Sequence, residues 1–266
     1  MQAYAGLPIL TAQPERPTRL VGIWPLEHEG SVAEYAWLAH AAVDELLAEG
    51  RTPVVCGGTG LYLRAALVDL AVPPAPSGEQ RARWERLYDR VGPERAHELL
   101  ADRDPETAAR VHANDRRRVV RALELTELGS SLLPESDRLW SDEMRHPTVV
   151  FGLDVPRDVL AARIEARAQA MLDAGVDEEA RRALAAGVSA TAIHALGLGE
   201  VAELPRGEAL EAIVLRTRRY AAYQRKWMRR IPGVVMVDAD RPADEVADDI
   251  VEMARARQLV PGRRGR

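Results

Sequence analysis

Cysteine and long apolar runs are scarce in this chain, and each scarcity excludes a class of protein. Cys56 is the single cysteine, so an intrachain disulfide framework and a cysteine-based zinc site are both excluded. It stands in an apolar run, which predicts a small buried side chain. No apolar run reaches the roughly 18 residues that cross a bilayer, and Met1 to Ala5 lack the basic and apolar regions of a signal peptide. We therefore expect a cytoplasmic protein with no membrane partner.

Lysine is almost absent, and arginine carries nearly all of the positive charge. Lys226 is the single lysine among 36 basic residues, and the net charge is −5. A negative net charge argues against indiscriminate binding to nucleic acid. Clusters of arginine still suit phosphate, because the guanidinium donates hydrogen bonds in pairs, although any one cluster taken alone is better explained as a solvated helix face. The clusters are Arg116, Arg117, Arg118 and Arg121; Arg216, Arg218, Arg219, Arg225, Lys226, Arg229 and Arg230; and Arg263, Arg264 and Arg266.

Short apolar runs rich in valine and isoleucine alternate with helical patterns along most of the chain. Its 266 residues, 47% hydrophobic and 29% charged, allow one or two globular domains with a packed core. The alternation predicts a parallel α/β sheet. Ser31 is expected to cap a crossover helix that ends at Gly50. The predicted strands are 20–23, 53–56, 148–155 and 234–237.

A glycine-rich turn, Gly57-Gly58-Thr59-Gly60, directly follows the predicted strand at 53–56. In open α/β sheets, ligands bind at the loops that leave the carboxyl ends of the strands. The turn is therefore a candidate site, although such a turn on its own is more often only a tight bend.

The pattern becomes helical and charged between the second and third predicted strands. Residues 77–146 are predicted to form a helical insertion between two parts of a core, 1–76 and 147–260, with a disordered tail at 261–266. Pro156 is expected to start a helix that carries Arg163 and Arg167 one turn apart. Two arginines so placed either reach a phosphate or merely coat the helix.

Several stretches in order along the chain resemble the tRNA dimethylallyltransferase family, also called the isopentenyltransferase or IPP transferase family. Any one of these stretches alone is weak evidence for the family. All of them together, in the same order and register as in the family, are specific evidence. They are Met1-Gln2 with Tyr4, Gly6, Leu7 and Thr11; Gly57 to Tyr62; Asn114-Asp115 with Arg118, Arg121, Ala122, Leu123 and Glu124; Arg163-Ile164 with Arg167, Met171 and Gly175; and Thr217 to Ala221 with Gln224 and Trp227.

The resemblance implies a fold and a reaction. The fold is a P-loop NTPase-like parallel sheet, typical of nucleotide-binding and ATP-binding proteins, with a helical insertion domain that contacts tRNA. The reaction moves a dimethylallyl group from dimethylallyl diphosphate to the exocyclic amine of the adenosine 3′ of the anticodon, in tRNAs that read codons beginning with U. Mg2+ is expected to assist the departing diphosphate. The partners are then the tRNA anticodon stem-loop and dimethylallyl diphosphate, and we expect a monomer.

The resemblance also implies roles for individual residues. Thr59 matches the threonine whose hydroxyl lies beside the amine and the diphosphate, and Arg218 matches an arginine that meets the diphosphate, so both are expected at the catalytic centre. Gln2 matches the glutamine that contacts the flipped adenine. Further diphosphate contacts are expected from Arg163 and Arg167. Further tRNA contacts are expected from Met1, Arg81, Arg117, Arg118, Arg121 and Gln224.

The chain departs from the family pattern at several places. The family's phosphate-binding loop and the aspartate two positions before its Met-Gln have no counterpart here, which leads us to expect that the true start lies upstream of Met1 and that the chain as given folds poorly. Ala222 and Tyr223 replace a basic pair, Leu198 replaces a tyrosine, and the segment 19–24 lacks paired histidines.

Two other functions stay open from the sequence. A P-loop small-molecule kinase shares the predicted sheet and a helix with two phosphate-facing arginines, but it gives no reason for the pattern from Thr217 to Trp227. A tRNA-binding fragment without catalysis predicts salt-sensitive binding to anticodon stem-loops and no turnover.

Overall fold

The chain is divided into two compact units. The computed structural model describes residues 1–70, 72–73, 78–133 and 138–257. One unit consists of Met1–Val68 with Trp140–Arg266, and the other of Asp69–Leu139, where the sequence predicts a helical insertion at 77–146. The predicted disordered tail, 261–266, lies outside the described residues.

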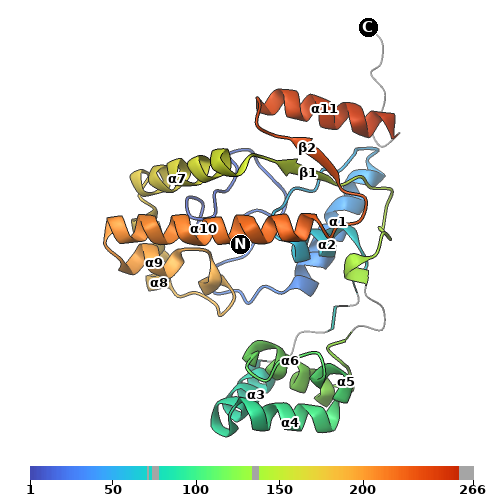
Figure 1. Cartoon of the computed structure of the whole chain (residues 1–266), viewed down its shortest axis with the longest axis vertical. Coiled ribbons are helices and arrows are strands. Elements are labelled where there is room, and N and C mark those ends of the chain that lie inside the picture. The colour runs from blue at the N-terminus through green and yellow to red at the C-terminus, as the bar shows by residue number, and fades with distance from the viewer. Residues whose placement is uncertain (71, 74–77, 134–137, 258–266) are drawn as a thin grey trace. The chain divides into compact units, whose positions relative to one another are not determined.

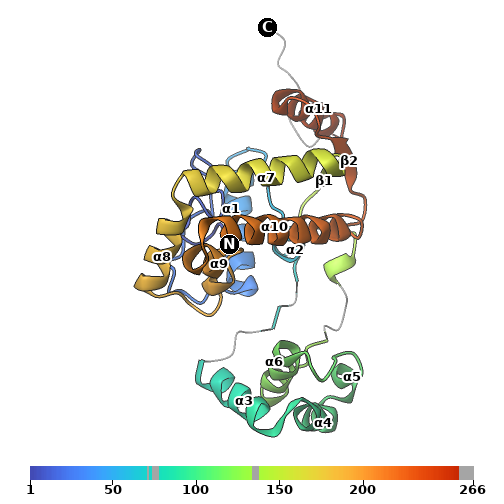
Figure 2. The same ribbon diagram turned by 60° about the vertical axis from the view of Figure 1, so that its left-hand side comes forward.

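The first unit contains a small parallel sheet. β1 (Phe151–Asp154) pairs with β2 (Val235–Asp238), and Phe151 lies opposite Val235. These strands confirm the predictions at 148–155 and 234–237, with shorter bounds. Parallel strands need a long crossover, and here it comprises α7 (Arg157–Asp173), α8 (Val176–Ala186), η2 (Ala192–His194), α9 (Leu198–Glu203) and α10 (Arg206–Met228). α7 and α10 lie side by side in both views, and α11 (Ala243–Ala256) follows β2 (Figures 1 and 2).

Two helices precede this part of the first unit. α1 (Val32–Ala48) begins where predicted, because the Ser31 hydroxyl accepts a hydrogen bond from the Glu34 amide at 3.1 Å. It ends just before Gly50, whose φ of +70° suits glycine. α2 (Gly60–Leu67) starts at the glycine-rich turn and packs against α1.

The predicted strands at 20–23 and 53–56 are wrong. Leu20 and Gly22 have φ angles of +64° and +63°, which a β-strand does not allow. Residues 53–56 have no hydrogen-bonded neighbouring strand among the described residues, and Val54 is 82% exposed. Cys56 is consequently exposed rather than buried. An apolar run predicts a strand only if a partner strand is beside it.

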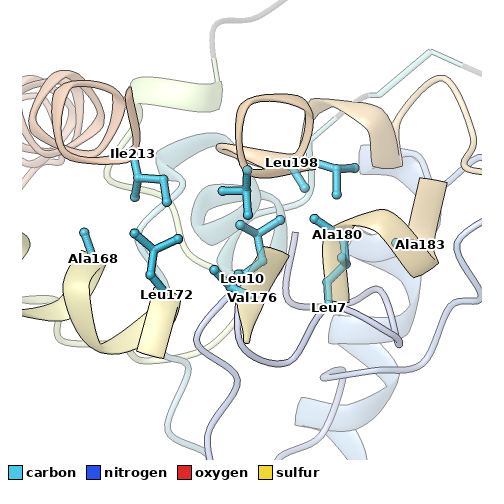
Figure 3. Packing of buried hydrophobic residues seen from close by; sticks show 11 residues of the cluster. Leu7, Leu10, Ala168, Leu172, Val176, Ala180, Ala183, Leu198 and Ile213 are labelled. Carbon is cyan, nitrogen blue, oxygen red and sulfur yellow. The ribbon is translucent and has the colours of Figure 1, made fainter. Parts of the chain in front are cut away.

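The core of the first unit is made mainly by helices. Leu172, Val176, Leu198 and Ile213, from α7, α8, α9 and α10, pack together with Leu7 and Leu10 from the N-terminal segment (Figure 3). This packing fixes α10 against α7 and α9. The N-terminal segment is thereby part of the folded core.

The second unit is helical throughout its described secondary structure. It contains α3 (Gly78–Val91), α4 (Pro93–Arg103), α5 (Pro105–Ala108) and α6 (Arg116–Glu127), and η1 (Arg138–Trp140) spans its boundary with the first unit. Leu100, Val119 and Leu123 are fully buried in its core. Asp115 caps α6 by accepting a hydrogen bond from the Arg118 amide at 3.1 Å. Among the helices that the structure describes, none is long and apolar enough to cross a membrane.

Candidate functional site

The glycine-rich turn lies against one face of α10. Thr59 occupies the N-cap position of α2, but its side chain does not cap that helix. Its hydroxyl instead lies 2.8 Å from the Tyr220 hydroxyl, at hydrogen-bonding distance. The Thr59 side chain is therefore held in a fixed place on the surface of α10.

Gly58 and Gly60 allow this close approach. A β-carbon at Gly58 would lie 2.0 Å from the Gln224 amide nitrogen, and one at Gly60 would lie 2.0 Å from the Trp227 ring. Tyr220, Gln224 and Trp227 follow the i, i+4, i+7 spacing of one helix face. The structure thus brings Thr59 and Gln224, both predicted site residues, to the same place.

Aromatic and cationic side chains continue this surface toward the end of α10. The Trp227 and Trp140 rings have centroids 4.6 Å apart, and the Arg230 guanidinium lies 3.6 Å from the Trp140 centroid. Tyr223 is half exposed and meets Trp227 edge-on at 6.0 Å. Within α2, the fully buried Arg64 donates to the Ser141 carbonyl at 2.7 Å, and burial lowers its pKa.

The predicted diphosphate-binding arginines lie on α7 and on another face of α10. Residues two apart in a helix point to opposite sides, so Arg218 points away from the Tyr220 face, and it forms an ion pair with Glu165 of α7. Arg163 forms an ion pair with Asp240 at 2.9 Å. Arg167 is exposed and has no ion-pair partner among the described residues. The structure therefore groups Arg218 with α7, and not with Thr59.

Gln2 is held by the N-terminal segment itself. Its side-chain nitrogen donates to the Thr11 carbonyl at 3.0 Å and to the Ala12 carbonyl at 2.8 Å, and its own carbonyl accepts from the Gly22 amide at 2.9 Å. Met1, the other predicted contact here, is 44% exposed. Gln2 is thus fixed in place although it is at the surface.

The predicted tRNA-binding arginines of the helical unit have different surroundings. The Glu124 carboxylate is fully buried and pairs with Arg81 and with Arg121, each at 3.1 Å. Arg118 is largely exposed and lies 3.5 Å from Asp115. Arg117 is exposed and has no ion-pair partner among the described residues. Arg117 and Arg118 are consequently the more accessible cations, while Arg81 and Arg121 are organised by a buried acid.

No protein metal cage is formed in the part of the chain that the structure describes. No group of three or more His, Cys, Asp or Glu side chains there is arranged to hold an ion.

Comparison with known proteins decides the family. The sequence profile of the IPP transferase family matches residues 2–231. The chain belongs to the IPP transferase family. Two similar proteins named tRNA dimethylallyltransferase, from Streptomyces griseus and Kineococcus radiotolerans, are 41% and 38% identical over 88% and 98% of this chain, and over 78% and 84% of their own lengths.

Solved structures of the IPP transferase family share the fold. The chain is similar to a tRNA isopentenylpyrophosphate transferase from Bacillus halodurans, with a TM-score of 0.66 and 29% identity over 97% of this chain and 85% of the other. A similar enzyme from Staphylococcus epidermidis gives a TM-score of 0.65 and 26% identity over 97% and 88%. A eukaryotic dimethylallyltransferase acting on tRNA, 20% identical, matches in fold with a TM-score of 0.75 over 99% and 73%.

Tyr220 of this IPP transferase contacts Thr59 but is not among the predicted site residues. It lies in the stretch from Thr217 to Ala221 that resembles the family, and its i, i+4 spacing from Gln224 is the signal that the two share a helix face. Of the departures from the family pattern, Leu198 is fully buried in the core, so its apolar side chain is accommodated by packing. Tyr223 packs on Trp227, and nothing in the structure explains the exposed Ala222.

Proposed function

We propose that this protein transfers a dimethylallyl group from dimethylallyl diphosphate to the exocyclic amine of the adenosine 3′ of the anticodon, in tRNAs that read codons beginning with U. Its relatives named tRNA dimethylallyltransferase support prenyl transfer to tRNA in general. The observation that carries the proposal is the contact between the Thr59 and Tyr220 hydroxyl groups, because it fixes a polar group within the turn that most resembles the family's reaction site.

The proposed reaction forms one bond and breaks one. The amine nitrogen bonds to the allylic carbon, the bond between that carbon and the diphosphate oxygen breaks, the diphosphate leaves with the electron pair, and the proton that the amine loses passes to water. Catalysis then requires that the amine and the allylic carbon be aligned and that the leaving diphosphate be stabilised. Thr59 is proposed to orient the reacting groups. Gln2 is proposed to hold the adenine.

Diphosphate binding is proposed for the arginines of α7 and α10. Arg163, Arg167 and Arg218 supply three guanidinium groups, and two of these groups are paired with single carboxylates, Asp240 and Glu165. These are surface ion pairs, each worth about 1 kcal/mol or less. A diphosphate carries more charge than one carboxylate, so it competes well for the same guanidinium groups. Arg218, which is paired with Glu165 and points away from Thr59 in this structure, would have to leave Glu165 to reach a diphosphate that is held beside Thr59.

Recognition of the anticodon stem-loop is proposed for the helical unit and for α10. Arg117 and Arg118 are exposed at the start of α6, and Gln224 faces the turn. Within the helical unit, Arg81 and Arg121 supply two further cations, and both are paired with Glu124. Phosphate contacts of this kind give binding that weakens steeply with salt.

The sheet, the metal ion, the cellular location and the oligomeric state are also part of the proposal. β1 and β2 are proposed as two strands of a P-loop NTPase-like sheet, and their helical crossover supports this assignment. Magnesium, if bound, would share oxygen ligands with the diphosphate and would neutralise part of its charge. A cytoplasmic monomer completes the proposal.

Label transfer from dimethylallyl diphosphate to an anticodon stem-loop tests this function. The unmodified protein is expected to label a stem-loop with adenosine 3′ of the anticodon. Thr59→Ala is expected to reduce the rate by at least about 10-fold, as loss of a positioned hydrogen-bonding group does. Stem-loop binding without labelling would support the alternative of a binding protein without catalysis, and phosphoryl transfer from ATP would support the kinase alternative.

A further inference from the structure

Glu179 is a buried carboxylate with no part in the proposed chemistry. It lies in the first turn of α8 and is only 4% exposed. One carboxylate oxygen accepts a hydrogen bond from the Ile9 amide at 2.9 Å, and the other accepts one from the Leu10 amide at 2.7 Å. Both carboxylate oxygens thus accept hydrogen bonds from consecutive backbone amides of a segment that is distant in sequence. Hydrogen bonds to an ionised acceptor are the strong ones.

These two donors belong to a helical turn at residues 7–13. The Thr11 amide donates to the Leu7 carbonyl at 3.0 Å, and the Gln13 amide donates to the Pro8 carbonyl at 2.9 Å. The first amides of such a turn have no partner within it, so Glu179 satisfies them as a capping side chain does. Leu7 and Leu10 hold the same turn against the core, because they pack in one buried cluster with Val176 and Ala180 of α8 (Figure 3).

The far end of the turn at 7–13 holds the side chain of Gln2. The Thr11 and Ala12 carbonyls are both acceptors, so only the amide NH2 group of Gln2 can meet them. The side-chain oxygen of Gln2 makes no hydrogen bond among the described residues. A base that meets Gln2 therefore meets a hydrogen-bond acceptor.

This orientation has a consequence for base selection. Adenine presents an amino group at position 6, which is a donor, whereas inosine and guanine present a carbonyl oxygen there, which is an acceptor. Two acceptors that face each other leave both without a partner. Gln2 with its nitrogen occupied thus selects adenine against a 6-oxo purine.

We propose that Glu179 is a positioning residue for adenine selection. By capping the turn at 7–13, it keeps the Thr11 and Ala12 carbonyls where they occupy the Gln2 nitrogen and leave the Gln2 oxygen for the base. Glu179 touches neither the base nor the diphosphate in this account. The inference rests on the proposed function, because it takes Gln2 to be the residue that meets the adenine.

Glu179→Gln is the informative variant, because it keeps the shape and changes the hydrogen bonding. A glutamine can accept from one of the two amides, but its NH2 group would face the other amide donor. Glu178→Gln is the matched control, since Glu178 lies one position away on α8 and is exposed, without an ion-pair partner among the described residues. Both variants remove one negative charge from the same turn of the helix.

The measurement is binding of two RNA stem-loops that differ only in adenosine or inosine 3′ of the anticodon. Dissociation constants are taken by fluorescence anisotropy at one fixed salt concentration. The unmodified protein is expected to prefer the adenosine stem-loop by about 10-fold, the effect of one mismatched buried hydrogen bond. Glu179→Gln is expected to lower this ratio to about 2 or less, and Glu178→Gln to keep it. A purely structural role for Glu179 would weaken binding of both RNAs equally and leave the ratio unchanged.

Each other outcome is decisive as well. A folded Glu179→Gln protein that keeps the ratio, or an unmodified protein that binds both RNAs equally, overturns the inference. Failure of the unmodified protein to bind either RNA overturns the proposed function instead. If thermal unfolding shows that Glu179→Gln does not fold, Glu179→Asp takes its place. It keeps the charge and both acceptor oxygens but shortens the side chain, so the carboxylate no longer reaches the Ile9 and Leu10 amides at 2.9 and 2.7 Å, and an unchanged ratio in a folded Glu179→Asp protein also overturns the inference.

Discussion

Replacing Gly60 by alanine should destabilise the first unit through a single steric contact. The added β-carbon would lie 2.0 Å from the Trp227 ring, and the ring has little room to withdraw because it stacks on Trp140 at 4.6 Å. Overpacking of this kind costs about 1 to 3 kcal/mol. The φ angle of Gly60 is not positive, so backbone strain contributes nothing.

Gly57→Ala is the matched control for this prediction. A β-carbon at Gly57 meets no atom within 4 Å. The Gly57→Ala protein should therefore have the same melting temperature as the protein with Gly57. For a unit of this size, each kcal/mol lowers the melting temperature by about 2 to 4 °C, and scanning calorimetry resolves that difference for Gly60→Ala. Trp227→Ala should remove the clash, so the double variant should be less destabilised than the sum of the single ones. Equal melting temperatures for the Gly57 and Gly60 variants would refute the account of the turn.

Three further predictions concern other contacts. Tyr220→Phe and Thr59→Val should each lower stability, and a double-mutant cycle should give a coupling of about 0.5 to 1.5 kcal/mol, whereas strict additivity would mean that the hydroxyl groups do not interact. Glu124→Ala should destabilise the helical unit by about 1 to 3 kcal/mol in denaturant unfolding, because two partly exposed arginines lose the acid that they share; a change below about 0.5 kcal/mol would contradict this. Arg83, Gln80 and Trp84 lower the pKa of Glu127 to about 2, so its stabilisation should be complete above pH 4.5 and should be lost as the pH falls toward 2. Glu127→Gln should flatten that part of the acid-unfolding curve, and an unchanged curve would count against the ion pair.

Local patterns predicted the parts of the fold that local interactions determine. The Ser31 cap and the helix end at Gly50 both follow from residues that are close in sequence. The run at 20–23 has equally apolar residues, but two left-handed φ angles bend it out of a strand. No composition rule detects that bend.

In the candidate site, too, residues within motifs were predictable from the sequence, and contacts between distant segments were not. Thr59 and Gln224 were found through motifs, and the structure brings them together. The partner of Thr59 is 161 positions away, and Glu179 is 170 positions from Ile9, so neither contact has a local signal. The pairing of Arg218 with Glu165 likewise depends on how α7 packs against α10.

The most direct test of the proposed function is to locate the modification on full-length tRNA. The unmodified protein is incubated with dimethylallyl diphosphate and tRNAs reading U-starting or other codons, and the products are digested and analysed by mass spectrometry. The account predicts one dimethylallyl group, on the adenosine 3′ of the anticodon and only in the first set, with Thr59→Ala strongly reduced. A prenyl group at another position, or equal modification of both sets, would contradict it.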